Sequence, residues 1–445
     1  MLDITIPDDS FTKELQRIRG LIEAGELPAA ARALNVAQRK APRDARVPLV
    51  GMRMAQRAGN VKGAISTARR ALDLAPQWPV AMLELGALLA SAGEPQQGQE
   101  AMRLAHQAVA LEPDDAQVLS NAAGIATACG DVPRAFEWVR RGVDRSPDNP
   151  RLRLALAQML AAARQPAEAK AQFDQLAERF PGDPAVVLGQ LGCALATGQP
   201  EAARQYADRA LALRPDDANA RYWHAVAHGR TPPTQPAASI ASLYDSYAPG
   251  FDAHLAHDLH YRLPERIGQL LRSLYPDLRF NVLDLGCGTG LVGACLGRIK
   301  GHIVGVDLSA RMIQQAQRRG VYSKFHRVNL LDALAHTPAG HYEVITCADA
   351  LIHVGELTPV VQGAWRVLKA GGYFIFSCEA AREGEPDLAL RLDGNRYAHR
   401  DTAVETLCRQ AGFAEVGIEQ LPMLRLEGDA PLPGFLVVAR KPAAA

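Results

Sequence analysis

The stretch VLDLGCGTG, Val282 to Gly290, decides the fold of the C-terminal half of the chain. Its first four residues place apolar side chains around a single acid, Asp284, which is typical of a short buried strand. The glycines that follow allow the backbone to approach a ligand at the start of a helix, which we expect near Leu291. The spacing is GxGxG with an acid two positions ahead, whereas the dinucleotide-binding form requires GxGxxG and fails because position 291 is leucine.

A second acid follows the last of these glycines by seventeen residues. The segment HIVGVDLS, His302 to Ser309, predicts another buried strand that ends in Asp307, where an adjacent strand offers a carboxylate to the hydroxyls of a ribose. The alternative role for Asp307 is a helix N-cap. Ser309 is better placed to cap the helix that we expect over residues 310–319, so we favour the ribose role.

The remaining pattern alternates strands and helices, which favours a doubly wound α/β domain with a parallel sheet and crossover helices. A strand is predicted over Tyr342 to Leu351, and the run Trp365 to Glu379 predicts a helix, a Gly-Gly turn and a strand. The last two strands, Val416 to Leu421 and Phe435 to Ala439, are joined by a short connection. We expect an antiparallel hairpin there, because a parallel return needs a dozen or more residues.

The N-terminal half repeats itself. Prolines at 42, 76, 113, 147, 181 and 215 are separated by 34, 37, 34, 34 and 34 residues. The residue twelve positions before each proline is alanine, and glycine, or Arg164 once, occupies the expected turn. The pattern predicts about six helical hairpins over residues 11–217, capped by a helix near Ala218 to His228. Such an array is either a surface for a protein or peptide partner or a packing and dimerisation module.

These signals divide the chain into three parts. We expect an α-helical repeat solenoid over residues 1–228, a Pro-rich linker over residues 229–239, GRTPPTQPAAS, and the α/β domain over residues 240–445.

Composition narrows the class of protein. Hydrophobic residues make up 48% and charged residues 22% of the chain, as in a folded globular protein. Lys and Arg (49) nearly balance Asp and Glu (48), so no positive field favours nucleic acid. There is no secretory signal or apolar run of membrane-spanning length, and the seven cysteines lack metal-ligand spacing. We expect a cytoplasmic protein with no metal site and no membrane partner.

The order VLDLGCGTG, VGVDLS, CADAL, LKAGGYFIFS and a terminal strand pair resembles the class I S-adenosylmethionine-dependent methyltransferases over about 200 residues. The N-terminal segments, such as residues 187–217, resemble tetratricopeptide repeats. The segments YDSYAPGFDAHL (Tyr244 to Leu255), FSCE, NRYAH and LRLEG are similar to bacterial tetratricopeptide-containing predicted methyltransferases, whose organisation covers nearly the whole chain.

The resemblance implies S-adenosylmethionine as the cofactor and assigns residues to it. Asp284 and the glycines hold the methionine part, Asp307 binds the ribose, and Asp349 lies by the sulfonium. The position near the adenine amino group that is often Asp is Asn329, with Asp332 nearby, and an amide oxygen can still accept from that amine. The residues expected at the cofactor are Asp284, Gly286, Cys287, Gly288, Gly290, Asp307, Leu308, Met312, Asn329, Leu330 and Asp349.

The transfer requires an acceptor atom held in line with the methyl group and water excluded, and a general base is optional. Acid–base candidates near the carboxyl ends of the strands are His353, Glu379 and His399. The candidates for contacts with the acceptor are Tyr244, Tyr247, Arg396, Tyr397 and Arg425.

Several of these candidates have structural alternatives. His353 is equally consistent with a polar residue on a turn, and Glu379 with a salt bridge to Arg396 or Arg425. The segment Arg391 to His399, RLDGNRYAH, predicts a loop over the carboxyl edge of the sheet that binds an anionic acceptor.

Three functions from different classes remain. The first is an active methyltransferase, the second a catalytically weak S-adenosylmethionine-binding scaffold that acts through its repeats, and the third a nucleotide-dependent oxidoreductase. The intact acids and glycines count against the second, and the failed GxGxxG spacing with the terminal hairpin counts against the third.

Overall fold

A computed structural model describes residues 10–92, 95–248, 250–253, 255, 259–428 and 430–444 of the chain. The chain divides into two compact units, Met1–Cys193 and Ala194–Ala445, with the division inside helix α11 (Pro184–Ala196). Within the described part of the chain, no helix combines the length and apolar character that crossing a bilayer requires.

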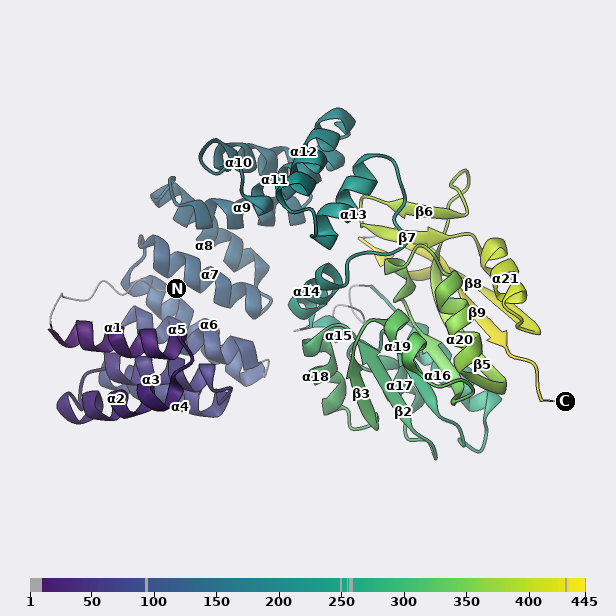
Figure 1. The fold of residues 1–445 in the computed structure, drawn as a ribbon, viewed down its shortest axis with the longest axis horizontal. Helices are drawn as coiled ribbons and strands as arrows, with labels where there is room; N and C mark the ends of the chain where they lie inside the picture. The colour runs from purple at the N-terminus through teal and green to yellow at the C-terminus, as the bar shows by residue number, and fades with distance from the viewer. Residues whose placement is uncertain are drawn as a thin grey trace. The chain divides into compact units, whose positions relative to one another are not determined.

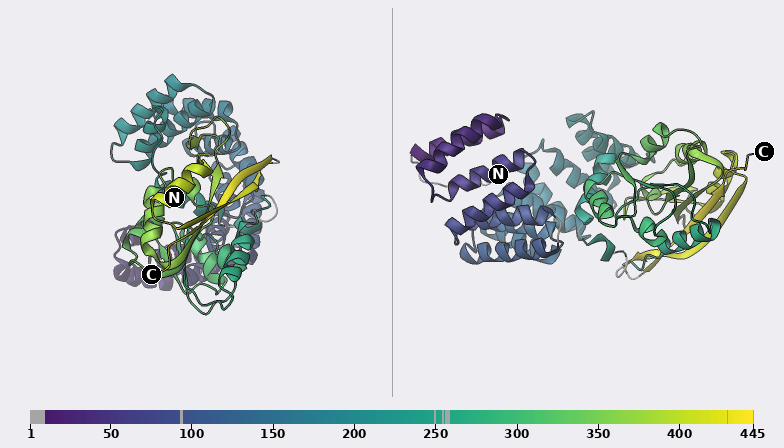
Figure 2. Two further views of the ribbon diagram at one scale, coloured as in Figure 1. Left: turned by 90° about the vertical axis from the view of Figure 1, so that its right-hand side faces the viewer. Right: turned by 90° about the horizontal axis from the view of Figure 1, so that it is seen from below.

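Helices α1 to α12 follow one another as six helix–turn–helix pairs, and the helices of the first unit lie side by side (Figure 1 and Figure 2). The pairs are α1 (Ser10–Glu23) with α2 (Leu27–Lys40), α3 (Arg46–Arg57) with α4 (Val61–Leu74), α5 (Pro79–Ala92) with α6 (Pro95–Leu111), α7 (Ala116–Ala128) with α8 (Val132–Arg145), α9 (Pro150–Ala162) with α10 (Pro166–Arg179), and α11 with α12 (Pro200–Leu213). The expected capping helix is α13 (Ala218–Ala227). The predicted solenoid is confirmed.

The repeating residues occupy equivalent places. Small side chains allow two helices to approach closely, and the six repeating alanines are all fully buried: Ala30, Ala64, Ala101, Ala135, Ala169 and Ala203. The turn glycines and Arg164, their one substitute, have positive φ. Gly93 lies outside the described residues. The spacing of 37 residues between Pro76 and Pro113, three more than in the other repeats, corresponds to a longer α6, which has 17 residues against 14 in α4 and α8.

The second unit contains a mixed sheet with the order β3-β2-β1-β4-β5, to which β9 adds antiparallel to β5 and β8 antiparallel to β9. Neighbours among β1 to β5 are parallel. The strands are β1 (Val282–Leu285), β2 (Ile303–Asp307), β3 (Lys324–Arg327), β4 (Tyr342–Cys347), β5 (Leu368–Ala380), β8 (Glu415–Glu427) and β9 (Ala430–Arg440). The terminal antiparallel hairpin agrees with the expectation from the short connection.

Alternating side chains of the strands build a core on each face of this sheet. Leu283 and Ile345 pack in one cluster with residues of α19 (Leu330–His336), α20 (Thr358–Val367) and α21 (Asp401–Gln410). Val282 and Val344, one position earlier, pack in the other cluster with α16 (Leu263–Leu274) and α17 (Leu291–Leu296). Because both faces are covered, the carboxyl edge of the parallel strands is left as the place for a ligand.

The segment expected to be a loop, Arg391 to His399, is instead largely part of a β-hairpin. Strands β6 (Leu388–Arg391) and β7 (Arg396–His399) pair antiparallel, and β7 extends the sheet beside the end of β5. Asn395, with a φ of 48°, turns the chain between them. The four-residue turn over 392–395 was misread because its polar residues are equally typical of a longer loop.

The Pro-rich segment lies against the α/β domain. Because proline has no N–H but keeps its carbonyl, the segment accepts hydrogen bonds from its surroundings. The N–H groups of Gly355 and Glu356 each donate to the carbonyl of Pro233 at 2.9 Å, and the hydroxyl of Tyr397 donates to that of Pro232 at 2.8 Å. The domain boundaries stay a prediction, but this segment is held in place.

Candidate active site

The glycine-rich turn directly follows β1. Gly286 and Gly288 have φ of 66° and 53°, in the left-handed region that favours glycine. A Cβ atom on Gly286 would lie 2.4 Å from the Cβ of Ala350, so a larger residue does not fit. Next to Gly288 no described atom lies within 4 Å of that position, and Gly288 faces the open space of a pocket.

Two acids flank this turn, Asp284 buried and Asp307 partly buried. Asp284 accepts hydrogen bonds from the hydroxyls of Tyr322 at 2.6 Å and Thr346 at 2.7 Å, and burial raises its pKa to about 6. Asp307 accepts the N–H of Gly288 on one oxygen and that of Ser309 on the other, both at 2.8 Å. Burial also raises the pKa of Asp307. Each Asp307 oxygen retains a lone pair for a further donor.

The pocket opens at the carboxyl ends of β1, β2 and β4, where sheets of this kind bind ligands. Helices α14 (Ala237–Tyr247) and α15 (Phe251–Ala253) supply part of its wall. Asp245 on α14 accepts from the hydroxyl of Ser309 at 2.5 Å, and Asp252 on α15 accepts from the hydroxyl of Thr289 at 2.5 Å. Both helices are thereby tied to the segments that follow β1 and β2.

A line of three polar side chains extends from the pocket wall into the interior. The hydroxyl of Tyr244 lies 2.9 Å from Nε2 of His353, and Nδ1 of His353 lies 2.8 Å from Oε1 of Gln235. The amide of Gln235 donates to the carbonyl of Asn395, which orients its oxygen towards His353. Therefore Nδ1 carries the proton and Nε2 accepts from Tyr244. Burial lowers the pKa of His353 to about 4, so the imidazole is neutral.

A cluster of mostly buried charges begins at Asp349 on the pocket wall. Asp349, with a φ of 55°, pairs with Arg425 at 2.5 Å. Arg425 also pairs with the fully buried Glu379, which Arg396 contacts at 2.7 Å and Arg391 at 3.5 Å. Opposite charges and hydrogen bonds compensate the cost of burying these groups.

Comparison with known proteins agrees with this geometry. Residues 283–376 match the family model of a methyltransferase domain, and residues 96–159, 140–191 and 160–228 match that of the tetratricopeptide repeat. A ubiquinone biosynthesis O-methyltransferase of Paracidovorax citrulli is 32% identical over 207 residues, which cover 41% of this chain and 85% of that protein. The chain belongs to the S-adenosylmethionine-dependent methyltransferases.

Other similar proteins also match part of this chain. A ubiquinone biosynthesis O-methyltransferase of Xanthomonas oryzae pv. oryzae is 31% identical over 122 residues, 27% of this chain. The match spans about half, 50%, of that relative's length. A solved SAM-dependent methyltransferase of Thermotoga maritima, titled a possible histamine N-methyltransferase, is similar with 19% identity, a TM-score of 0.32, and coverage of 45% of this chain and 99% of that one. The solved structure of the Pseudomonas aeruginosa protein pilF is similar with 18% identity and a TM-score of 0.42, and the match covers 49% of this chain and 98% of that one.

The pocket of this methyltransferase fits S-adenosylmethionine. Asp307 has acceptor capacity for two hydroxyls, Gly288 leaves the backbone uncovered, and apolar side chains of Leu308 and Leu330 line the wall. The expected cofactor residues that line the pocket are Asp284, Gly286, Cys287, Gly288, Asp307, Leu308, Asn329, Leu330 and Asp349. Gly290 and Met312 lie outside the lining set: Gly290 caps α17, and Met312 is fully buried on α18 (Ala310–Arg318).

The candidates for catalysis and acceptor binding separate into two groups. Tyr244 and His353 line the pocket. The others do not: Tyr247 is exposed, His399 is buried with Nε2 3.0 Å from the carbonyl of Gly355, and Tyr397 is fully buried. Glu379, Arg396 and Arg425 belong to the buried charge cluster. Their placement favours the structural alternative for these three residues. The segment Arg391 to His399 is largely a β-hairpin rather than the expected loop, and its contact with the acceptor stays a prediction.

Other pocket residues were missed from the sequence. Thr234 comes from the Pro-rich segment, Ile240 from α14, and Phe251, Leu255 and Tyr261 from the stretch that precedes α16. Gln235, which orients His353, also comes from that Pro-rich segment. Phe251 and Leu255 fall within the segment Tyr244 to Leu255 that carries the family resemblance. Thr234 and Gln235 belong to no motif, because they act through contacts with His353, more than a hundred positions away.

Proposed function

We propose that this chain transfers a methyl group from S-adenosylmethionine to an oxygen of a small, partly apolar acceptor. The observation that carries the proposal is that Asp307 and the glycine-rich turn line the same pocket as Tyr244 and His353. Oxygen is favoured as the methylated atom by the names of the O-methyltransferase relatives. Phe251, Leu255 and Tyr261 on the wall favour an apolar or aromatic acceptor body.

The cofactor supplies an activated methyl group, so the side chains need only bind, orient and exclude water. The hydroxyl of Tyr244 donates a hydrogen bond to Nε2 of His353. The lone pairs of the Tyr244 oxygen are therefore left to accept a hydrogen bond from a hydroxyl of the methyl acceptor. The neutral imidazole of His353, with a pKa of about 4, is a weak base. Burial raises the pKa of Tyr244 well above its usual value. The pair therefore acts by positioning the acceptor, and the proton that the acceptor hydroxyl loses on methylation passes to bulk solvent.

For the repeats we propose the binding of an extended peptide segment of a protein partner. A polar groove in the first unit is lined by Arg53 and Gln56 of α3, Glu84 of α5, and Ser120 and Asn121 of α7. Nδ2 of Asn121 is buried, and no described residue accepts a hydrogen bond from it. A peptide carbonyl would satisfy this donor.

The test is a methylation assay of the full chain with labelled S-adenosylmethionine and cell extract separated into protein and small-molecule fractions. Label in a small-molecule fraction that depends on Asp307 supports the proposed reaction, whereas cofactor binding without labelling of any fraction supports the catalytically weak scaffold. Label confined to protein contradicts the small acceptor.

The variant Asn121→Ala, with exposed Ser66→Ala as control, tests the groove. We expect it to lose partner binding without losing cofactor binding. A concentration-dependent dimer disrupted by the same variant would instead assign the groove to a second copy.

A further inference from the structure

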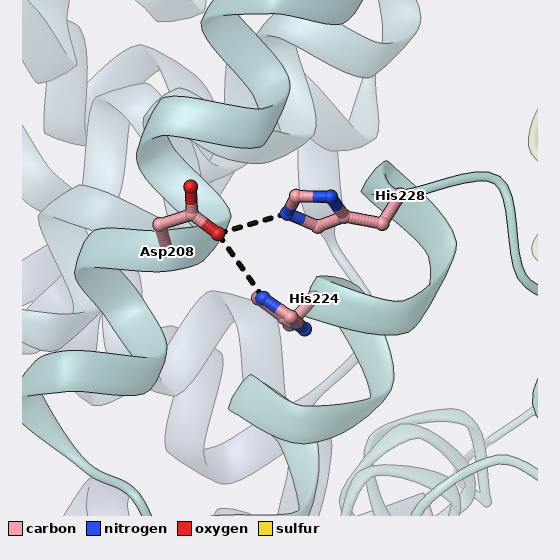
Figure 3. A group of neighbouring side chains, drawn as sticks. All are labelled: Asp208, His224 and His228. Carbon is pink, nitrogen blue, oxygen red and sulfur yellow. Dashed lines mark hydrogen bonds and ion pairs between the residues drawn. The ribbon is translucent and has the colours of Figure 1, made fainter.

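Three potential metal ligands meet where α12 packs against the end of α13, apart from the methyltransferase pocket (Figure 3). Asp208 projects from α12, His224 lies on α13, and His228 directly follows α13. Nε2 of His228 lies 2.8 Å and Nε2 of His224 lies 3.1 Å from the same oxygen, Oδ1 of Asp208. In Figure 3 both imidazole rings direct a nitrogen towards this carboxylate.

We propose that Asp208, His224 and His228 form a binding site for a divalent transition-metal ion of the zinc type. Two imidazole nitrogens and one carboxylate oxygen are a common protein ligand set for such ions, and water would complete the coordination. Mg²⁺ and Ca²⁺ are disfavoured because they prefer oxygen ligands alone.

The backbone sets this arrangement before an ion binds. His224 and His228 are four positions apart, which places their side chains on one side of α13, and the N–H of His228 still donates to the carbonyl of His224 at 3.2 Å. The two rings lie 4.4 Å apart between centroids. Little conformational freedom of the main chain would therefore be lost on binding.

The distances suit an ion after a small adjustment. Ligand bonds of about 2.1 Å in tetrahedral geometry separate the ligand atoms by about 3.4 Å. The nitrogen–oxygen distances of 2.8 and 3.1 Å are those of hydrogen bonds, and the three ligand atoms all lie within 4.8 Å of one another. An ion would therefore take the place of the hydrogen-bonded protons after a small movement of the side chains. All three side chains are partly exposed, which permits this movement and leaves the site open to solvent.

Arg230 is the neighbouring group that would compete. Its Nη2 lies 3.3 Å from Nδ1 of His224, an arrangement that requires Nδ1 to be an acceptor. Binding of an ion through Nε2 places the proton on Nδ1, so Arg230 must turn away. Arg230 is exposed and its side chain is free to do so at low cost. Arg230→Ala should consequently keep or strengthen metal binding.

An ion here would join the end of α13 to α12. The chain continues from His228 into the segment that supplies Gln235 to His353, and Tyr222 on α13 donates to Asn395 at 2.8 Å. The site is thus a structural clamp on the helix that precedes this part of the pocket, and its test does not depend on methyltransferase activity.

The experiment is calorimetric titration of the full, untagged chain with Zn²⁺. Loss of a group that merely supports a metal ligand often weakens binding by about tenfold or more, so His224→Ala, His228→Ala and Asp208→Asn should each weaken binding at least about tenfold. His302→Ala, an exposed histidine before β2, is the matched control and should bind as the wild type does. Zn²⁺ should raise the Tm of the wild type and leave that of His224→Ala/His228→Ala unchanged.

The double variant keeps all seven cysteines, so any Zn²⁺ that it retains measures binding at other groups, the thiols among them. Equal binding by the wild type and the double variant would overturn the proposal. A thiolate charge-transfer band in the Co²⁺ spectrum of the wild type, retained in the double variant, would do so as well. A Co²⁺ spectrum without that band, lost in the double variant, supports the nitrogen–oxygen site.

Discussion

The hydroxyl of Tyr244 lies 2.9 Å from Nε2 of His353, and this contact joins α14 to the turn that follows β4. Since Gln235 holds the proton of His353 on Nδ1, the proton between the two rings belongs to Tyr244. The tyrosine oxygen is left as an acceptor at the pocket. Gln235, in the Pro-rich segment before the expected α/β domain, thus orients a side chain of the pocket wall.

Tyr244→Phe should lower kcat by up to about tenfold, because one hydrogen bond of about 1 kcal/mol to the acceptor is lost. Affinity for S-adenosylhomocysteine should stay within about twofold. Tyr247→Phe, on the same helix but exposed, is the control and should leave kcat unchanged. Steady-state kinetics and calorimetry check both values; an unchanged kcat for Tyr244→Phe would remove Tyr244 from the acceptor site.

Acidification should reveal the buried state of His353. Its pKa is about 4 in the folded protein against 6.5 normally, so the unfolded chain takes up a proton before the folded chain does. The stabilising contribution is complete above pH 6.5 and is lost as the pH falls towards about 4, a change of about 3 kcal/mol. Between about pH 7 and about pH 4.5 the free energy of unfolding should therefore fall more in the wild type than in His353→Gln, as measured by urea unfolding. The raised pKa of Asp284 acts in the opposite direction but is common to both proteins. Parallel losses in the two proteins would refute the buried neutral imidazole.

Asp307→Ala should weaken binding of S-adenosylhomocysteine at least about tenfold, because two hydrogen bonds to a charged carboxylate are removed. Calorimetry measures this change directly. Asp277→Ala serves as the control: this acid is exposed, lies outside the pocket lining and should keep wild-type affinity. Unchanged binding by Asp307→Ala would contradict the ribose assignment.

Glu379→Gln should lower the free energy of unfolding by about 3 to 5 kcal/mol, because Arg425 and Arg396 would lose a buried counter-charge. Glu405→Gln, which removes an exposed ion pair with Arg409 on α21, should cost at most about 1 kcal/mol. Denaturant unfolding provides the comparison.

Turnover per folded molecule should persist in Arg396→Ala and His399→Ala. A loss of turnover at unchanged Tm would instead assign both residues to the acceptor site.

A chain shortened to begin at about residue 237 should lose stability and turnover relative to one that begins at Ala194. The shorter chain lacks Gln235 and the carbonyls of Pro232 and Pro233, which accept from Tyr397, Gly355 and Glu356. Thermal unfolding and activity of the two chains distinguish the alternatives. Equal Tm and turnover would establish residues 229–239 as a linker in the strict sense.

The sequence by itself determined the features that repeat or that depend on local backbone geometry. The alanines and prolines at a spacing near 34 predicted the helical pairs, because a small residue is needed wherever two helices approach closely. The glycines after β1 and the acid at the end of β2 predicted the pocket edge, because the carboxyl ends of parallel strands meet there.

Only the tertiary structure decided which polar side chains face the pocket. His353 and His399 are equally polar in sequence, yet one lies on the wall and the other donates to the carbonyl of Gly355. The pair His224 and His228 was visible as HAVAH, but Asp208, sixteen residues before His224, joins it only when α12 and α13 pack. The burial and the hydrogen-bond partners of a side chain depend on residues distant in the chain, so a local sequence pattern does not predict them.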